Sequence, residues 1–576
     1  MSPRPNYLVI VADDLGFSDV GSFGSEISTP NLDNLSKHGS RFTDFHTAAA
    51  CSPTRSMLMS GTDHHLTGLG QLAEFVNRSR AHQGKPGHEG YLTERIATLP
   101  QVLQSGGYHT IMSGKWHLGL LPEYSPKARG FDKSFALLPG AANHYGWLPQ
   151  LNDPEDIPGF LKATSYALHM EDGEYYDNSK LPEDFYSTNF YASKLIEYLE
   201  NRPSDKPFFA YLPFSAPHWP LQAPPEFVEK YKGKYDDGPE VLRAKRLKRQ
   251  VELGLISDEV VPHPVVPLGS SEWDKLTDLE RQKSARSMEV YAAMVECMDY
   301  NIGRVFDYLK EQGLYDDTVV IFMSDNGAEG ASLEAQPFIK GGLQEHLEKY
   351  YDNSLDNIGR KNSWVWYGPR WAQAATAPSR LFKMFSTEGG CRVPLIIKPP
   401  NGPREAIVTE FSTVMDLMPT FLDLAGVPKP QGTFQGREVL PIRGESWVPY
   451  LDGKTDHIHD QDYVIGWELV GQAALRKGKW KINFVAQPAG PQKWELFDLD
   501  QDPGETTDLA HQHPEKLEEL IAHWEQYAKD SGVVGLVTDF ERIIAEDEVK
   551  DIRKWMQVDF SYNIARKIKA PGVSPL

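Results

Sequence analysis

The sequence is short of cysteine, of positive charge and of long apolar runs. Its 576 residues contain three cysteines, Cys51, Cys297 and Cys391, which are too few and too scattered for a disulfide framework, so we expect a reducing compartment. Asp and Glu number 80 against 59 Lys and Arg, and the net charge of −21 argues against nucleic acid and anionic membranes as partners. No apolar run approaches the length of a membrane span, and no secretion leader precedes the first strand.

These absences favour a cytoplasmic protein that is not bound to a membrane. The chain ends in Ser574-Pro575-Leu576, a variant of the peroxisomal Ser-Lys-Leu address, so a peroxisomal location is the alternative. The length is enough for one large hydrophobic core and a smaller one. Nothing in the sequence demands more than a monomer.

Acidic and amide side chains follow two apolar segments that are predicted to be buried strands of a parallel sheet. Asp13-Asp14 follows Tyr7–Ala12, and Asp325-Asn326 follows Thr318–Ser324. Ligands of open α/β sheets bind beyond the carboxyl ends of the strands. Carboxylate and amide oxygens suit Ca²⁺ or Mg²⁺ rather than zinc, so we predict a hard-cation site; a helix cap or a turn is the structural alternative for each pair.

Cys51 is predicted to lie at or just before the N-terminus of a helix. Pro53 fits the first turn of that helix, and Arg55, one turn after Cys51, can reach the same face. Helix N-termini favour anions, and a nearby Arg lowers the pKa of a thiol. This pattern indicates a reactive cysteine, although a small buried Cys in a Pro-capped turn is the alternative.

Two further segments place basic side chains after predicted strands. His109–Met112 leads to Lys115 and His117 in a Gly-flanked loop, and residues two apart in an extended segment face the same side. His218 follows the predicted strand Phe208–Phe214 and is bracketed by prolines, which favour a fixed loop. We expect Lys115 and His117 to face the site.

The pentapeptide Cys51-Ser52-Pro53-Thr54-Arg55 matches the Cys-x-Pro-x-Arg pattern of the sulfatase family, and Gly107–His117 resembles the second signature of that family. The resemblance covers roughly Pro5 to Gly532 and is closest to bacterial-type arylsulfatases. It implies an alkaline-phosphatase-like α/β sandwich with a large, mostly parallel mixed sheet. Conversion of Cys51 to formylglycine by a separate maturation enzyme is also implied.

The resemblance further implies a role for each site residue. Lys383 precedes Gly389–Pro394, which matches a Gly-Gly-x-Arg-x-Pro segment before which the family places a sulfate-binding Lys. Lys115 and Lys383 would bind sulfate, Arg55 would hold the aldehyde hydrate, His117 would be the base and His218 the acid at the leaving oxygen. The implied ligands of the cation, Ca²⁺ in preference to Mg²⁺, are Asp13, Asp14, Asp325, Asn326 and Cys51.

The chemistry of sulfate ester hydrolysis explains why a formylglycine is needed in place of a cysteine. A thiolate is a poor nucleophile at sulfur because the resulting thiosulfate ester has no easy exit. One hydroxyl of an aldehyde hydrate can attack sulfur, and the other can later lose its proton and expel sulfate. The predicted activity is hydrolysis of aryl, and by extension alkyl, sulfate monoesters. A phosphodiester or phosphonate monoester hydrolase on the same fold is the first alternative, and a non-catalytic binding protein is the second.

Composition and periodicity predict three regions. Residues 1–430 form an α/β catalytic domain, 431–535 a smaller domain with an antiparallel sheet and a helix at Glu515–Lys529, and 536–576 a C-terminal extension. The aromatic excursion Ala328–Phe382 is either a pocket wall or a satellite core. The basic cluster Arg243–Arg249 is predicted to be a solvated helix face rather than a polyanion-binding patch.

Overall fold

A computed structural model describes residues 4–76, 79, 81–147, 167–331, 343–399 and 406–536. Within those ranges no helix has the length and apolar character needed to cross a membrane. The predicted peroxisomal signal Ser574-Pro575-Leu576, and all but the first residue of the predicted extension 536–576, lie outside the described residues.

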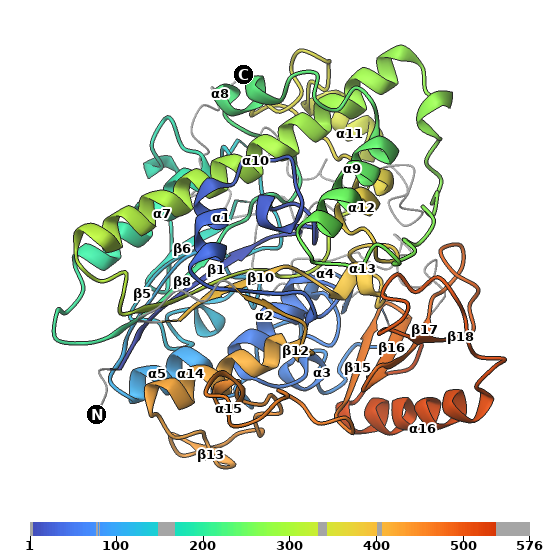
Figure 1. Cartoon of the computed structure of the whole chain (residues 1–576). Helices are drawn as coiled ribbons and strands as arrows, with labels where there is room; N and C mark the ends of the chain where they lie inside the picture. The colour runs from blue at the N-terminus through green and yellow to red at the C-terminus, as the bar shows by residue number, and fades with distance from the viewer. Residues whose placement is uncertain are drawn as a thin grey trace.

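The centre of the fold is a ten-stranded mixed sheet with the strand order β11-β2-β10-β9-β1-β8-β4-β5-β6-β7 (Figure 1). The five strands from β9 to β5 run parallel, and antiparallel pairs flank them. This confirms the predicted α/β class with a large mixed sheet. The strands are β1 (Asn6–Ala12), β2 (Ser40–Phe42), β4 (His109–Lys115), β5 (Lys133–Leu137), β6 (His169–Glu171), β7 (Glu174–Tyr175), β8 (Phe208–Pro213), β9 (Thr318–Ser324), β10 (Leu395–Lys398) and β11 (Ala406–Val408).

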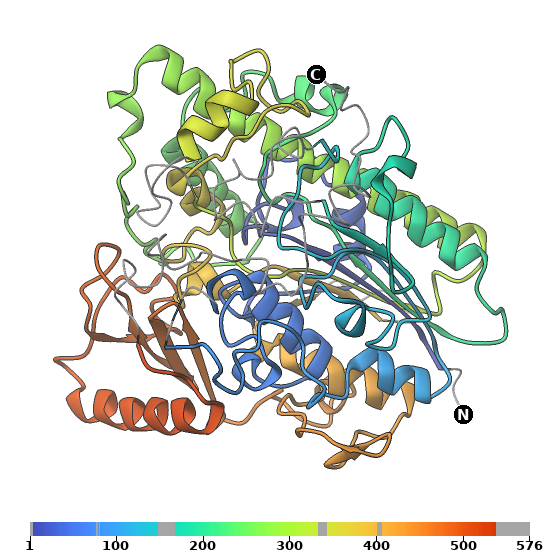
Figure 2. The same cartoon turned by 180° about the vertical axis from the view of Figure 1, so that it is seen from behind.

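Helices cover both faces of this sheet (Figures 1 and 2). One face carries α1 (Pro30–Lys37), α7 (Ser187–Glu200) and α10 (Asp278–Glu311), and α10 contacts both of the others. The other carries α2 (Cys51–Ser60), α5 (Leu99–Ser105) and α14 (Leu417–Ala425). Within the described residues, further helices before the second sheet are α3 (His64–Thr67), α4 (Ala73–Val76), α8 (Pro225–Val228), α9 (Pro239–Glu252), α11 (Leu343–Tyr350), α12 (Pro369–Ala375), α13 (Glu388–Cys391) and α15 (Val448–Leu451).

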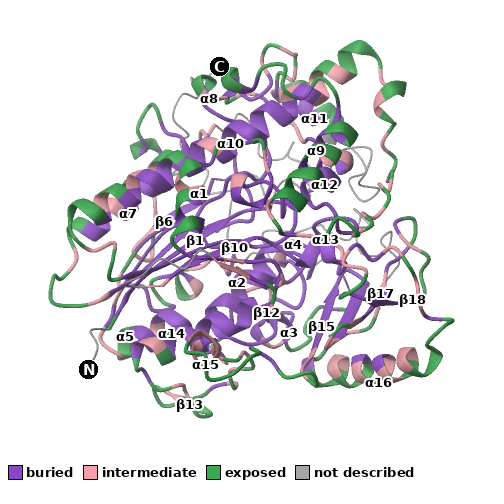
Figure 3. Ribbon diagram, in the orientation of Figure 1, coloured by how far each residue is buried: buried purple, intermediate pink, exposed green. Residues whose placement is uncertain are grey.

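The register of the central strands brings distant acidic residues together. Strand β1 pairs with β9 so that Ala12 lies opposite Ser324, and both strands are buried throughout (Figure 3). The residues that follow, Asp13-Asp14 and Asp325-Asn326, therefore meet at one sheet edge. Strand β8 flanks β1 on its other side and leads the chain from Pro213 toward His218 at the same edge.

Three boundaries differ from the sequence-based expectation. The sequence Arg-Phe-Thr-Asp-Phe at residues 41–45 predicts one strand, but the structure divides it between β2 and β3 (Phe45–His46). Strand β3 pairs with β12 (Ser412–Thr413) in a sheet of its own. Strand β4 continues to Lys115, so that residue ends a strand rather than lying in a loop. The apolar stripe over residues 286–313 predicts a helix that begins at Arg286, but α10 begins at Asp278, because Thr277 and Glu280 form a capping box.

A second, antiparallel sheet follows in the chain. It contains β15 (Val464–Leu469), β16 (Gln472–Lys477), β17 (Trp480–Phe484) and β18 (Trp494–Asp498), and α16 (Pro514–Ser531) packs on it. This confirms the predicted small antiparallel sheet and its helix. The division of the chain at residues 430 and 535 stays a prediction. A short hairpin, β13 (Thr433–Phe434) and β14 (Arg437–Glu438), connects the two parts.

Buried ion pairs fasten the second sheet to the first region. The Nζ of Lys481 in β17 lies 2.7 Å from an Oε of Glu388 in α13 and 3.0 Å from Glu505. His46 contacts the same Glu388 carboxylate at 3.0 Å. Glu388 thus anchors the start of the Gly-Gly-x-Arg-x-Pro segment that follows Lys383.

The basic cluster Arg243–Arg249 lies on α9, and one member contradicts its assignment to a solvated face. Arg246 is buried on the same stripe as Leu242 and Gln250, four residues to either side. Its guanidinium pairs with Asp19 and lies 2.8 Å from Glu26. Helical spacing turns this position inward, whereas Arg249 remains exposed.

A charged histidine in the first region also contacts the second sheet. His65 in α3 is buried, with Nδ1 3.0 Å from Asp63 and Nε2 3.1 Å from Glu468 in β15. Burial alone would lower the pKa of His65, but the hydrogen bonds and charges of Asp63 and Glu468 raise it to about 9. The imidazolium therefore bridges two carboxylates across the junction.

This bridge predicts a pH-dependent stability. A folded pKa of about 9, above an unfolded value of about 6.5, stabilises the fold fully below pH 6.5, and this stabilisation is lost as the pH rises toward 9. The loss for this one group is roughly 3 kcal/mol. The thermal unfolding midpoint of His65→Gln should therefore approach that of the wild type between pH 6.5 and 9. A difference between His65→Gln and the wild type that stays constant from pH 6.5 to 9 would contradict the assignment.

Candidate active site

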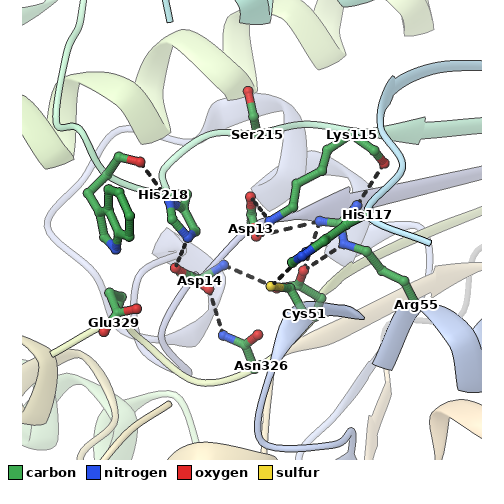
Figure 4. Close-up of polar contacts among 12 residues, drawn as sticks. Asp13, Asp14, Cys51, Arg55, Lys115, His117, Ser215, His218, Asn326 and Glu329 are labelled. Atoms are coloured by element: carbon green, nitrogen blue, oxygen red, sulfur yellow. Dashed lines mark hydrogen bonds and ion pairs between the residues drawn. The ribbon is translucent and has the colours of Figure 1, made fainter. Parts of the chain in front are cut away.

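Side chains from six separate segments converge at the carboxyl edge of the central sheet, and Figure 4 labels residues from most of these segments. They follow β1 and β9, start α2, end β4, follow β8 and precede α13. All the predicted site residues are within this cluster and all are buried: Asp13, Asp14, Cys51, Arg55, Lys115, His117, His218, Asp325, Asn326 and Lys383.

The acidic part of the site is held together by its own hydrogen bonds. The backbone N–H of Asp14 donates to Asp325 Oδ1 at 3.1 Å, and Asn326 Nδ2 donates to Asp14 Oδ1 at 2.8 Å. Asp14 has a φ of 68°, a left-handed conformation that costs a non-glycine residue about 1 kcal/mol. These contacts turn Asp14 back toward the residues after β9.

The donor atoms of this group fit a hard divalent cation. Asn326 Oδ1 is buried and has no hydrogen-bond partner, an unusual state for an amide oxygen. Ligand atoms of Asp13, Cys51 and Asp325 lie within 4.8 Å of one another, and so do those of Asp13, Asp14 and His218. A set dominated by carboxylate and amide oxygens suits calcium or magnesium rather than zinc.

Three buried cations balance the three carboxylates. Lys115 Nζ donates to both oxygens of Asp13, at 2.8 and 2.7 Å, and Lys383 Nζ donates to Asp14 at 2.9 Å. Arg55 donates from Nε and Nη2 to Asp325 Oδ2 at 2.9 and 2.8 Å. Such pairing removes the large cost of burying isolated charges.

Cys51 is the first residue of α2, as predicted. Its Sγ lies 3.3 Å from His117 Nδ1. Burial would raise the pKa of the thiol, but the charges of Lys115, His117 and Lys383 lower it to about 7. By contrast, burial raises the pKa of Cys297 to about 12. The environment of residue 51 therefore favours negative charge.

His117 faces Cys51 through a backbone conformation that the sequence does not reveal. We expected Lys115 and His117 to share a side because extended residues alternate. The structure brings both to the site, but His117 has a φ of 57°, so simple alternation does not apply. Its Nε2 lies 2.9 Å from Glu74 Oε1. Burial would lower the pKa of His117, but Glu74 and Cys51 raise it to about 9.

His218 stands on the opposite side of the acidic group. Its Nδ1–H donates to the carbonyl of Trp219 at 2.6 Å. Its Nε2 lies 3.3 Å from Asp14 and 3.4 Å from Lys383. Burial, together with Lys383 and Lys115, lowers the pKa of His218 well below its usual value. The two histidines are therefore tuned in opposite directions.

Sequence reasoning missed two carboxylates that back the cationic residues. Glu329 lies 3.1 Å from Lys383 Nζ, and Glu74 contacts His117. Glu329 comes shortly after Asn326, in the segment that follows β9, and this position could have identified it as a candidate site residue. Glu74 is in the short helix α4 and follows no strand, so no local pattern marks it.

The aromatic excursion has a mixed outcome. Trp364 is fully buried and Trp371 nearly so, which places both in the core. Trp366 is partly exposed, and its ring centroid lies 5.7 Å from that of Trp219, next to His218. The ring centroid of Trp364 also lies 5.9 Å from that of Trp219, so two tryptophans of the excursion contact the residue that follows His218.

Comparison with known families decides what this arrangement belongs to. The family model described as Sulfatase matches residues 5–427. The chain belongs to the sulfatase family. A second model, described as N-sulphoglucosamine sulphohydrolase, C-terminal, matches residues 380–530 of this sulfatase.

Curated relatives agree with that assignment. An uncharacterized sulfatase of Schizosaccharomyces pombe is 55% identical over 542 residues, covering 94% of this chain and 96% of that protein. An arylsulfatase of Klebsiella aerogenes is 38% identical over 445 residues, covering 77% and 91%. The solved structure of Ps i-CgsB in complex with k-i-k-neocarrahexaose superposes with a TM-score of 0.64 at 23% identity, covering 95% of this chain and 99% of that one, and supports the fold.

These findings establish this sulfatase as a sulfuric ester hydrolase. The family generally uses a formylglycine made from cysteine together with a divalent metal ion. None of these matches favours the phosphodiester or phosphonate alternative.

The unpartnered Asn326 oxygen predicts a measurable cation effect. Protein stripped with a chelator should gain thermal stability when a divalent cation is added, by roughly 2.7 kcal/mol at a hundred times the dissociation constant. Asn326→Ala should reduce the gain, because it removes one oxygen ligand. Differential scanning calorimetry would measure this, with Asn201→Ala, at the end of α7, as the control. Equal gains in both variants would exclude Asn326 from the cation site.

Proposed function

We propose that this sulfatase hydrolyses aryl sulfate monoesters, and alkyl ones more slowly, using a formylglycine made from Cys51 and a bound Ca²⁺. The main support is the placement of Cys51 Sγ 3.3 Å from His117, at a helix N-terminus, inside the buried charge cluster. Similarity to the Klebsiella aerogenes arylsulfatase supports the aryl substrate class.

The oxygens of Asp13, Asp14, Asp325 and Asn326, together with residue 51, would hold the calcium ion. Calcium would supply positive charge that polarises a sulfate oxygen. Calcium is preferred to Mg²⁺ because a site of several carboxylate and amide oxygens on two strand ends matches its higher, less rigid coordination.

Two lysines would bind the transferring sulfate group. Lys115 and Lys383 are buried, and their positive charges lower the pKa of the Cys51 thiol, so both act on the position to which sulfate would be transferred. Their ammonium groups stabilise negative charge as it grows on the sulfate oxygens. Arg55 fixes Asp325 and donates to the carbonyl of Lys115 at 2.9 Å, which keeps the end of β4 against α2.

The two histidines would move protons on opposite sides of the sulfur atom. His117 Nδ1 faces residue 51 and can accept a proton from its oxygen after maturation. His218 commits Nδ1–H to Trp219, so Nε2 is the atom that can deliver a proton to the leaving oxygen.

The site residues and the net charge together indicate which partners the enzyme would have. The substrate is a small-molecule sulfate ester, and a formylglycine-generating enzyme must act on Cys51. The negative net charge, −21, opposes nucleic acid and anionic membranes as binding partners. We place the enzyme in the cytoplasm as a monomer, with the peroxisome as the alternative location.

Mass spectrometry of the peptide that carries residue 51 tests this function directly. The peptide from active protein should have lost sulfur and gained an aldehyde. Turnover of nitrophenyl sulfate would be measured on the same preparation. Full activity with an unmodified thiol would exclude the formylglycine mechanism.

The assignment of His218 predicts a substrate-dependent loss. His218→Ala should slow alkyl sulfates by about 10²–10⁴-fold, the usual effect of removing a general acid. Nitrophenyl sulfate should lose less, because its leaving group needs less protonation. Steady-state kcat/KM for one alkyl and one nitrophenyl ester measures the contrast, and equal losses would remove His218 from the acid role.

A further inference from the structure

Glu74 is buried behind His117, on the side away from the acidic group. It lies in α4 (Ala73–Val76), and its Oε1 is 2.9 Å from His117 Nε2. His117 Nδ1 in turn is 3.3 Å from Cys51 Sγ. The three side chains form a continuous line, Glu74 to His117 to residue 51, with no other residue between them.

This line fixes which nitrogen of His117 can accept a proton. A carboxylate only accepts hydrogen bonds, so the contact with Glu74 requires a proton on Nε2. In the neutral ring Nδ1 then carries the lone pair, and that atom faces residue 51. Once Nδ1 gains a proton, the negative charge of Glu74 stabilises the imidazolium.

His218 lacks this arrangement, which makes the two histidines functionally distinct. The nitrogen of His218 that points away from the site donates to the neutral carbonyl of Trp219. A carbonyl stabilises an imidazolium less than a carboxylate does. The carboxylate behind His117 therefore favours proton acceptance there, whereas His218 is set up to give its proton away.

We propose that Glu74 is a positioning residue that acts through His117 in the release of sulfate from residue 51. This inference rests on the proposed function. After transfer, one oxygen on the carbon of residue 51 bears the sulfate group and the other is a hydroxyl. His117 Nδ1 takes the hydroxyl proton, the O–H electron pair forms C=O, and the C–O bond to sulfate breaks, so that sulfate leaves with that bond's electron pair. Water then adds to the aldehyde and restores the hydrate.

Glu74→Gln tests the proposal because it replaces the carboxylate by a neutral amide of the same shape. The release of sulfate from residue 51 should slow about 10- to 100-fold, the usual loss when a residue that supports a site residue is removed. The transfer of sulfate from the ester to residue 51 should change little. Rapid mixing with 4-nitrophenyl sulfate should therefore give a burst of about one nitrophenolate per active site. Sulfate should also accumulate on the peptide that carries residue 51, measured by mass spectrometry after acid quenching.

Matched variants separate this role from a structural one. Glu329→Gln removes the carboxylate on Lys383 and should slow transfer without accumulating sulfate on residue 51. Glu252→Gln, on an exposed side chain of α9, removes the same charge and should leave both steps unchanged. If Glu74→Gln slows both steps equally and retains no sulfate, Glu74 is only structural and the proposal is wrong.

A double variant tests whether Glu74 acts through His117. Glu74→Gln combined with His117→Ala should be no slower in release than His117→Ala alone. An added loss would overturn the proposal. If Glu74→Gln does not fold, Glu74→Asp can be used instead, because it keeps the negative charge. Glu74→Asp should release sulfate at a rate between those of the wild type and His117→Ala. A rate equal to that of His117→Ala would also overturn the proposal. An unmodified residue 51 in active wild-type protein would instead refute the proposed function itself.

Discussion

The neutralisation of buried charge is the constraint on which this structure depends. Asp13, Asp14 and Asp325 lie in the interior, and each is paired with a buried cation. None of these groups could be desolvated alone without a cost of several kcal/mol. The cations come from α2, the end of β4 and the segment before α13, so the site closes only when these distant parts of the chain have assembled.

The same charges divide the site into two electrostatically different sides. His117 is backed by Glu74, and the pKa of its ring is raised to about 9. His218 is backed by a carbonyl and crowded by Lys383 and Lys115, and its pKa is lowered. Two identical side chains thus acquire opposite proton affinities from their surroundings.

Much of the site could be predicted from the sequence, because residues that follow neighbouring parallel strands meet at one edge of the sheet. Buried apolar runs located β1 and β9, and parallel pairing then forced Asp13-Asp14 and Asp325-Asn326 together. Contacts made by residues outside such patterns could not be predicted. Glu74 reaches His117 from a short helix, the left-handed turn at His117 depends on tertiary packing, and Asp19, the partner of the buried Arg246, is remote from it in sequence.

The ion pairs of Glu388 affect when, during synthesis of the chain, the segment after Lys383 gains its full set of contacts. A ribosome makes Lys383 and Glu388 well before Lys481 and Glu505, which fasten Glu388 from the second sheet. Until β17 and residue 505 have emerged, Glu388 can contact His46 but not Lys481 or Glu505. A nascent chain that lacks the second sheet therefore holds the segment after Lys383 by fewer contacts than the folded protein does.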